Sequence, residues 1–555
     1  MVIIPSGYEN GTLGSLKPLD GTGDFTFSRG SDISATRVNE DGYIEKGYEN
    51  LLLQSNTFSD AAWQKIFANV TGGQAGYDGS NDAWKVNSNS IYSNVRQTQN
   101  QTGLVTLSVY AKKGEYDYVG LYFSGNVVGV IFSLIDGGVE NPIFTYPDIY
   151  ANGESVGNGW YRFSITHNLS NTGRAEIFVC ETTSYNGNTT TGEGIYIQDA
   201  MLNQGMVAYP YVETTTAPVA GGILEDMPRL DYSGSCASLK LEPQRTNLVE
   251  YSEYFGGWDI RPIYTNTTAQ NKEGRDINSL YGLSAISIIL PSAGTYAYSV
   301  YAKKDTWDFL VLRDTNFATT SRTWFDLANG VVTSAGSSHG TPTITPEGDG
   351  WYRCTIYLTA STDLIGNVVF TQAQTSGSFT DGTNDQEAIF VDMAQCEEGS
   401  YPTSYIPTYG TSQTRLRDTT ATLSSPAIAG ATEFTWFFDN TNATIVPAAL
   451  PIFWLKSNTD DNLIYFATQG GRFYSLPYFG FTNSVGKVCV KYDGTTFTMF
   501  LNGEKSTDTL TKSFGTTSEL LALNYANEGF SGPLHQMLFF KTALSDDECI
   551  ELTTI

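Results

Sequence analysis

Bulky apolar residues alternate with small or polar ones along most of this chain. Residues 106–111 (Thr-Leu-Ser-Val-Tyr-Ala) and 298–302 (Tyr-Ser-Val-Tyr-Ala) are clear examples. A period of two places successive side chains on opposite faces of a β-strand, so these segments predict strands with one buried face. Asp-Gly and Asn-Gly pairs at Asp136, Asn329 and Asp349 separate such segments and predict tight turns. The pattern is typical of β-sandwiches of the jelly-roll kind.

The pattern occurs twice. Tyr-Ala-Lys-Lys at residues 110–113 recurs 191 positions later at 301–304, and Gly-Trp-Tyr-Arg at 159–162 recurs at the same offset at 350–353. Two tetrapeptides at one offset indicate an internal duplication. The likeness extends outward and defines two units, residues 50–217 and 247–417. The tryptophans that both units share inside strand patterns predict core positions: Trp63, Trp160, Trp258 and Trp351.

Three further segments complete the domain division. Residues 1–49 are predicted to be an N-terminal attachment or connector segment. Residues 218–246 are predicted to be an ordered connector, because they contain prolines and no Gly/Ser run. Residues 418–555 change pattern and form a third β-domain, in which Ser545 and Glu548 have capping-box spacing for a short terminal helix. The sequence thus predicts an all-β chain of tandem, duplicated β-sandwich domains followed by a C-terminal sandwich.

The composition agrees with this fold and excludes other classes. Apolar residues make up 40% of the chain and aromatic residues 13%, which is too much for a disordered protein. At 555 residues the chain needs several hydrophobic cores. The formal net charge of −27, without a cluster of basic residues, disfavours nucleic acid and anionic membrane surfaces as partners.

Targeting and metal motifs are missing from the sequence. No stretch approaches the roughly 18 apolar residues of a membrane span, and the first ten residues lack a signal-peptide pattern. We therefore expect a protein made in a cytoplasm, without membrane insertion. The six cysteines form no Cys-x-x-Cys pair, so we expect buried free thiols rather than a zinc or redox motif.

Several motifs resemble known families. Residues 492–503 and 543–548 are similar to laminin-G-like, concanavalin-A-type lectin domains, which implies a concanavalin-A-like sandwich for residues 418–555. The two repeats resemble carbohydrate-binding-module jelly rolls at the shared tetrapeptides and at residues 195–199. Residues 24–39 and 228–247 look like segments common in large structural proteins of tailed bacteriophages.

The last resemblance implies a virion surface protein, such as a tail fibre, a spike or a head decoration. Such a protein would assemble in the host cytoplasm and contact other virion proteins of the capsid, portal or tail. It would also form a homo-oligomer, which the likeness to fibres implies is a trimer. Host surface polysaccharide is the further partner that the lectin-like and carbohydrate-binding-like modules imply.

Sugar binding requires flat aromatic rings that stack on a pyranose, with polar groups beside them for the hydroxyls. Two candidates are equivalent positions just after the shared Tyr-Ala-Lys-Lys strand, and the others lie in loop-like surroundings of the third domain. Core or inter-domain packing is the competing interpretation of each aromatic residue. The candidate carbohydrate-binding residues are Tyr116 with Asp117, Trp307 with Asp308, and Trp454, Tyr474 and Tyr478.

A structural calcium ion is the one cofactor that the sequence suggests. Jelly-roll modules hold such an ion through oxygen ligands, and the first repeat offers Asp78, Asn81 and Asp82 with Asp199 from its last strand. The second repeat departs from this pattern, because Met393 aligns with Asp199. Turn chemistry is the competing account of residues 78–82.

The sequence predicts no catalytic site. The three histidines lie in different segments, and neither a nucleophile elbow nor a paired-carboxylate pattern of a glycosidase is present. Helix capping explains the nearest acidic cluster, residues 546–548. Two alternatives to glycan binding stay open: a purely structural virion component without a sugar site, and a polysaccharide depolymerase with a carboxylate pair assembled by the fold.

Overall fold

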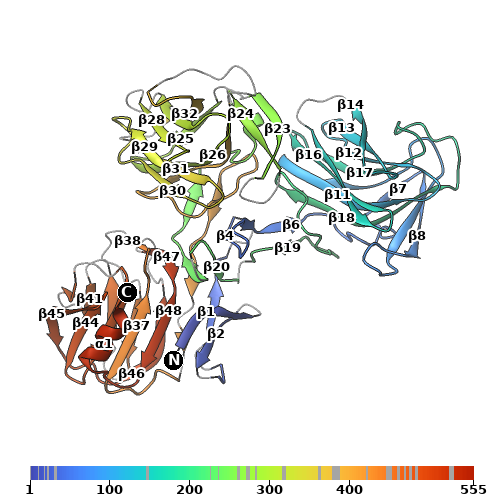
Figure 1. Cartoon of the computed structure of the whole chain (residues 1–555). Coiled ribbons are helices and arrows are strands. Elements are labelled where there is room, and N and C mark those ends of the chain that lie inside the picture. The colour runs from blue at the N-terminus through green and yellow to red at the C-terminus, as the bar shows by residue number, and fades with distance from the viewer. Residues whose placement is uncertain are drawn as a thin grey trace.

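The computed structural model confirms the predicted all-β class (Figure 1). Three β-sandwiches follow one another: repeat 1 (residues 50–217), repeat 2 (residues 247–417) and a C-terminal module. The structure describes residues 2–9, 12–17, 19–21, 24–30, 34–144, 149–224, 227–234, 237–258, 263–270, 276–281, 284–315, 321–360, 364–377, 388–420, 423–424, 426–445, 453–458, 463–467, 470–473, 478–481, 485–523 and 530–554.

Repeat 1 consists of two six-stranded antiparallel sheets. In spatial order the first sheet contains β14 (Val139–Phe144), β13 (Val128–Ser133), β12 (Tyr118–Phe123), β17 (Gly173–Cys180), β10 (Asn94–Gln99) and β7 (Gln64–Ile66). The second contains β15 (Tyr150–Gly157), β16 (Trp160–Leu169), β11 (Gly103–Lys113), β18 (Gly194–Gln204), β9 (Ala83–Ser88) and β8 (Ala68–Gln74). Alternate residues of both sheets point inward and form one apolar core.

Repeat 2 has the same plan. One sheet contains β23 (Ile263–Gln270), β24 (Asp276–Tyr281), β33 (Ile389–Glu398), β26 (Gly294–Lys304), β31 (Trp351–Ala360) and β30 (Thr343–Pro346). The other contains β25 (Ser284–Leu290), β32 (Leu364–Ala373), β27 (Phe309–Thr315), β28 (Arg322–Asp326) and β29 (Val331–Ser334), and a 3₁₀ turn, η1 (Phe255–Gly257), precedes them.

The duplication extends to the backbone register. Tyr110 pairs with Arg162 across β11 and β16, and Tyr301 pairs with Arg353 across β26 and β31. Both repeats break the register of their last strand at the same place, where Asp199 and Met393 have φ angles of 53°. All four shared tryptophans are buried, as predicted: Trp63, Trp160, Trp258 and Trp351.

The C-terminal module is a sandwich of a nine-stranded and a six-stranded sheet. The larger contains β35 (Thr419–Thr420), β3 (Phe25–Ser28), β2 (Thr12–Lys17), β1 (Val2–Glu9), β48 (Gln536–Phe540), β37 (Phe434–Asp439), β43 (Lys487–Tyr492), β44 (Thr496–Leu501) and β45 (Glu504–Thr511). The smaller contains β36 (Leu423–Ser424), β46 (Thr517–Leu523), β39 (Phe453–Ser457), β40 (Leu463–Ala467), β41 (Gly470–Phe473) and β42 (Tyr478–Phe479). Helix α1 (Asp546–Thr553) follows, and Ser545 and Glu548 form the predicted capping box.

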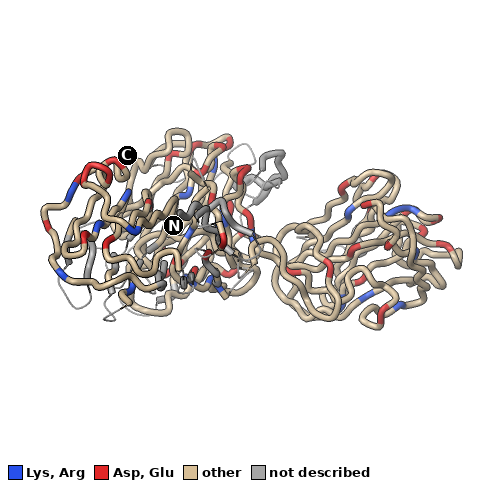
Figure 2. Tube along the Cα trace, turned by 90° about the horizontal axis from the view of Figure 1, so that it is seen from below, with Lys and Arg blue, Asp and Glu red and all other residues tan. Residues whose placement is uncertain are grey.

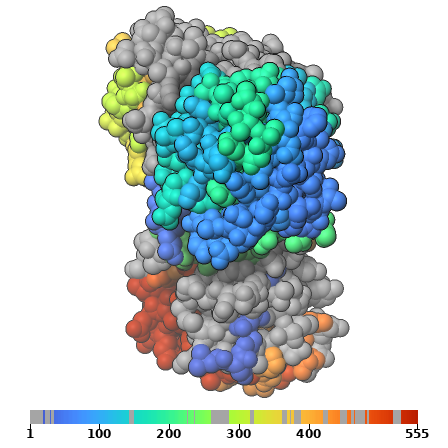
Figure 3. Space-filling model, turned by 90° about the vertical axis from the view of Figure 1, so that its right-hand side faces the viewer, coloured from blue at the N-terminus to red at the C-terminus, as the bar shows by residue number. Residues whose placement is uncertain are grey.

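The N-terminal segment and the connector belong to these modules structurally. Strands β1 to β3 lie in the C-terminal sheet, where the N-terminal residues appear blue among red and orange ones in Figure 3. In the connector, β20 (Arg229–Asp231) and β21 (Ser238–Leu241) share a sheet with β47 (Phe530–Leu534) and β38 (Thr444–Ile445). Three strand pairs complete the joints: β4 (Thr36–Val38) with β5 (Ile44–Lys46), β6 (Tyr48–Asn50) with β19 (Val219–Gly221), and β22 (Arg245–Asn247) with β34 (Gln413–Arg415).

A buried ionic cluster fastens these joints. Arg229 forms ion pairs with Asp418 and, at 2.9 Å, with Glu242. Arg415 also contacts Glu242 at 2.9 Å, and Arg29 from the N-terminal segment contacts Asp418 at 3.4 Å. Burial alone would raise the pKa of Glu242, but the two arginines beside it hold this pKa well below its usual value. The cluster therefore joins three segments that lie far apart in the sequence: the N-terminal segment, the connector and residues 415–418.

Repeat 1 forms a separate lobe, joined to the rest of the molecule through a narrow neck (Figure 2). In the same figure, acidic and basic residues are scattered along the trace rather than gathered in one patch. Within the described ranges, no helix has the length and apolar character needed to cross a bilayer. The described cysteines are buried free thiols, as predicted, and Cys236 lies outside the described residues.

Candidate binding surfaces

The first predicted sugar-stacking residue is part of a core. Tyr116 is 1% exposed, and its hydroxyl donates a hydrogen bond to the carbonyl of Thr190. Its ring packs among the apolar core residues of repeat 1, so neither ring face is open to a ligand. Asp117 beside it forms an ion pair with Lys113. The position just after the Tyr-Ala-Lys-Lys strand therefore serves packing in repeat 1.

The other predicted aromatic residues are spread over two modules. Trp307 is partly exposed and packs on the core of repeat 2, while Asp308 forms an ion pair with Lys304 at 2.5 Å. Trp454 is 8% exposed within the C-terminal module. Tyr474 and the side chain of Tyr478 lie outside the described part of the chain. Trp307 and Trp454, the two that are described, belong to different modules.

The predicted calcium ligands form a hydrogen-bonded loop. The side-chain nitrogen of Gln198 donates to Asp82 at 2.8 Å and to Asp78 at 3.3 Å, and Asn81 is exposed. The backbone N–H of Tyr77 donates to the other end of the Gln198 amide at 3.1 Å, which fixes this orientation. One side-chain amide thus donates to both carboxylates.

In this arrangement hydrogen bonds hold the acidic residues of the loop, and calcium binding there stays a prediction. No group of three or more acidic, histidine or cysteine side chains in the described ranges has the arrangement of a metal site. Asp199, the fourth predicted ligand, accepts a hydrogen bond from the Tyr77 hydroxyl at 3.0 Å. Hydrogen bonds and turn chemistry account for residues 78–82 in this structure.

A surface rich in tyrosine lies on the outer side of repeat 1. Tyr77, Tyr196 and Tyr211 are partly exposed there and pack around the buried Tyr110 and Trp160. The rings of Tyr77 and Tyr110 stack with centroids 3.9 Å apart. We call this surface, made by Tyr77, Tyr196 and Tyr211 with Asp199, the tyrosine face.

The equivalent surface of repeat 2 is apolar and covered by another part of the chain. Phe390 and Met393 stand where repeat 1 has Tyr196 and Asp199, and both are buried. Ile44, on the hairpin of β4 and β5, packs over this surface. Lys46 of the same hairpin forms a buried ion pair with Glu253 at 2.5 Å. Repeat 1 thus has Tyr196, Asp199 and partial exposure where repeat 2 has Phe390, Met393 and full cover.

Charged and polar groups line the tyrosine face. Burial raises the pKa of Asp199 to about 7, and the nearby carboxylates of Asp82 and Asp78 raise it further against the opposing hydrogen bond from Tyr77. The ammonium group of Lys85 lies 5.8 Å from the ring centroid of Tyr196. The face therefore combines aromatic rings, a carboxyl group that can donate or accept, and a cation.

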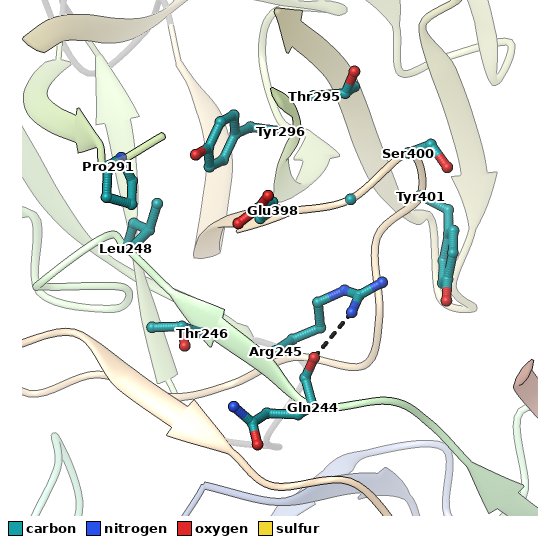
Figure 4. A pocket seen from close by; sticks show the side chains of 11 residues that line it. Gln244, Arg245, Thr246, Leu248, Pro291, Thr295, Tyr296, Glu398, Ser400 and Tyr401 are labelled. Atoms are coloured by element: carbon teal, nitrogen blue, oxygen red, sulfur yellow. Dashed lines mark hydrogen bonds between the residues drawn. The ribbon is translucent and has the colours of Figure 1, made fainter. Parts of the chain in front are cut away.

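A cleft of about 560 Å³ opens at one end of repeat 2 (Figure 4). Arg245 and Gln244 border it on one side, with Tyr401 beside Arg245, and Glu398 lies across from them, with Tyr296 next to it. The Tyr296 hydroxyl is held by Ser292, and its ring is fully buried. The cleft is therefore a polar recess without an exposed aromatic ring face.

Arg245 is held at the border of the cleft by three contacts. Its guanidinium carbon lies 5.5 Å from the ring centroid of Tyr401, and Nη1 donates to the carbonyl of Gln244 at 2.9 Å. Nε lies 3.9 Å from the Glu397 carboxylate, and this side chain is only 10% exposed. Within the described residues Nε makes no hydrogen bond, which is uncommon for a buried donor.

A buried group in repeat 2 has the composition of a hydrolase triad. His339 lies between Thr323 Oγ1 at 2.7 Å and Asp314 Oδ1 at 3.0 Å, and the backbone N–H of Gly336 also donates to Thr323. All three side chains are fully buried, so no substrate can reach the threonine hydroxyl. The group fastens the loop that carries His339 to β27 and β28.

Sequence reasoning missed both surfaces. The difference between Tyr196 and Phe390, like that between Asp199 and Met393, is visible in the aligned repeats and was the available signal. Nothing local in the sequence marks Arg245 and Glu398 as neighbours. Comparison with models of known protein families and with curated protein sequences gave no match.

Proposed function

We propose that this chain is a bacteriophage virion surface protein, such as a tail fibre, spike or head decoration, and that repeat 1 binds host polysaccharide on its tyrosine face. The observation that carries the binding proposal is the contrast between the repeats. One sheet surface is apolar and covered by the chain in repeat 2, whereas in repeat 1 it is polar, aromatic and partly exposed. The resemblance of residues 24–39 and 228–247 to phage structural proteins supports the setting.

The chemistry of the tyrosine face suits a polyhydroxylated ligand. Partly exposed tyrosine rings can lie against the C–H face of a pyranose. The tyrosine hydroxyls and the ammonium group of Lys85, which also pairs with Glu115, can bond the sugar hydroxyls, while the buried Asp199 holds the Tyr77 hydroxyl. Single contacts of this kind are weak. Several copies on one particle would raise the overall avidity by about 10²–10⁴-fold.

A glycan array and a host-cell binding assay test this proposal with the full-length protein. We expect Tyr196→Ala and Tyr211→Ala each to lower the affinity for a bound glycan by about tenfold or more, since aromatic anchors dominate such contacts. Tyr122→Ala is the matched control, because Tyr122 is a partly exposed tyrosine on the opposite sheet of the same module. Equal loss of binding in all three variants, or no binding by folded wild-type protein at high surface density, would contradict the proposal.

A purely structural role is the second candidate, and a separate observation favours it. Tyr116 and Trp454, placed where a sugar platform was expected, are buried. Under this alternative the sandwiches stabilise the particle and bind no sugar. Immunogold labelling of purified particles tests the virion setting for both candidates, and release of reducing ends from host capsule would instead identify a depolymerase.

A further inference from the structure

The cleft of repeat 2 has a counterpart in repeat 1, because the elements around it are duplicated. Asn247 at the end of β22 donates to the carbonyls of Ala394 and Ile406, as Asn50 at the end of β6 donates to those of Ala200 and Val212. By this alignment Arg245 corresponds to Tyr48, and Glu398 corresponds to Gln204. Arg245 and Glu398 line the cleft in repeat 2, whereas Tyr48 and Gln204 line a cavity of only about 10 Å³ in repeat 1.

The counterpart in repeat 1 is small because Tyr409 fills it. The carbonyl of Tyr409 accepts a hydrogen bond from the backbone N–H of Leu104 at 2.8 Å. Gly205 gives the Tyr409 ring its space, since a Cβ there would lie 3.3 Å from the ring. Gly103 does the same for the carbonyl, since a Cβ there would lie 2.0 Å from the Tyr409 oxygen. Tyr409 is 6% exposed and forms part of the joint between the repeats.

Repeat 2 keeps the backbone part of this geometry, whereas the Arg245 guanidinium lies beside Gly399. Gly399 donates to the carbonyl of Thr295 at 2.8 Å, just as Gly205 donates to that of Leu104 at 3.0 Å. The N–H and C=O of one residue in an antiparallel strand point to the same side. Thr295 corresponds to Leu104, so its N–H points toward the place that the Tyr409 carbonyl occupies beside Leu104 in repeat 1. Gly399 has a φ of +147° and corresponds to Gly205 with +116°.

We propose that the cleft of repeat 2 is a docking site for an extended segment of a different polypeptide, one that presents a tyrosine-glycine pair as Tyr409 and Gly410 do to repeat 1. Its backbone carbonyl accepts from Thr295, and its ring packs in the cleft beside the Arg245 guanidinium, which itself lies against Gly399. Tyr409 of a second copy is not the occupant, because each chain buries this residue in its own joint.

A sugar fits the cleft less well than a peptide. Tyr296 is fully buried and Tyr401 is 9% exposed with Arg245 against its ring, so neither offers a face for stacking. The recess instead combines the Arg245 guanidinium, the Glu398 carboxylate and the beginning of strand β26 at Thr295. These are groups that recognise main chain and polar side chains.

The test uses a synthetic peptide of residues 406–412 (Ile-Pro-Thr-Tyr-Gly-Thr-Ser), titrated to about 5 mM into the full-length protein and followed by isothermal calorimetry. We expect saturable binding, and at least about tenfold weaker binding of the peptide carrying Tyr409→Ala. Two variants address the cleft. Gly399→Val displaces the Arg245 side chain, since a Cβ added at residue 399 would lie 3.2 Å from the guanidinium, and Arg245→Ala removes the cation without straining the backbone.

Both variants should lose at least about tenfold in affinity for the peptide. Arg96→Ala, a partly exposed arginine on repeat 1, is the control and should bind as wild type does. No saturable binding by wild-type protein, or equal binding by wild type and both cleft variants, overturns the proposal. If Arg245→Ala loses the binding of a glycan and keeps the binding of the peptide, the cleft is a sugar site and the docking proposal is wrong. The tyrosine face lies on the other repeat, so its glycan binding can fail or succeed independently.

Discussion

Replacing Asp418 by asparagine would test what holds the modules together. Asp418 is fully buried; it pairs with Arg229 and Arg29 and accepts a hydrogen bond from the Glu242 backbone N–H at 3.0 Å. The amide keeps the size of the side chain and loses its charge. The cluster of Arg29, Arg229 and Arg415 would then lose one of its carboxylates, and Glu242 would stay paired with Arg229 and Arg415. Removing one partner of a buried ion pair costs about 3–5 kcal/mol, because the remaining charge stays desolvated.

Differential scanning calorimetry measures this effect, with limited proteolysis to locate it. A multi-domain chain does not unfold in one step, so the relevant quantity is the transition of the C-terminal module with its N-terminal strands. For a unit of this size, about 3–5 kcal/mol corresponds to a midpoint roughly 6–20 °C lower. Cleavage should appear first in the connector and N-terminal segments.

Asp546→Asn is the matched control. Asp546 also pairs with two cations, Lys491 and Lys505, but its side chain is 37% exposed. Exposed pairs contribute about 1 kcal/mol or less, so this variant should leave the transition nearly unchanged. If Asp418→Asn behaves like Asp546→Asn in both assays, the buried cluster does not hold the joint and the reasoning above is wrong.

Three further predictions follow from charged groups. The folded-state pKa of Asp199 is raised to about 7 from 3.8. Ionised Asp199 therefore lowers the free energy of unfolding, and this loss grows as the pH rises from about 4 to about 7. Asp199→Asn should raise the unfolding midpoint of repeat 1 at pH 8 and not at pH 4. The pKa of Glu242 is depressed, so its stabilisation is complete above its unfolded value and is lost as the pH falls through the folded one; Glu242→Gln should weaken the acid dependence of a pH-stability curve. Arg353 is buried and bonds Thr403 and Ser299, so Arg353→Ala should destabilise its repeat by about 1.5–3 kcal/mol in urea unfolding, more than Arg162→Ala does.

Local signals in the sequence were sufficient for the fold class and the duplication. Alternating side chains specify strands directly, and the repeated motifs of each unit form the same pairs in space, as Tyr110 with Arg162 and Tyr301 with Arg353 show. The capping box at Ser545 depends on neighbouring residues alone. Strand pairing between β1 and β48 joins residues more than five hundred positions apart. No local pattern encodes such a partner.

Burial was the harder property to predict for the candidate sites. Tyr116 and Trp307 are equivalent in sequence, yet one is buried and the other partly exposed. Tyr196 and Phe390 occupy one position of the duplicated sheet, and their environments differ because a distant hairpin covers only the second. Whether an aromatic residue binds a ligand or a neighbouring segment thus depends on long-range packing. Comparing the two repeats in one structure supplies that information.

Separating the repeats would test this reading of their two surfaces. In the isolated unit of residues 50–217, Tyr77 still covers Tyr110 by stacking on its ring. This unit should therefore be soluble and bind little of the dye ANS. Residues 247–417 lack the hairpin that covers Phe390 and Met393, so this unit should expose that apolar surface and bind ANS strongly or aggregate. Adding a peptide of residues 34–50 should reduce the ANS signal of the second unit and leave the first unchanged. If both isolated units bind ANS alike, the hairpin is not what distinguishes the two surfaces, and the contrast that supports sugar binding on repeat 1 loses its basis.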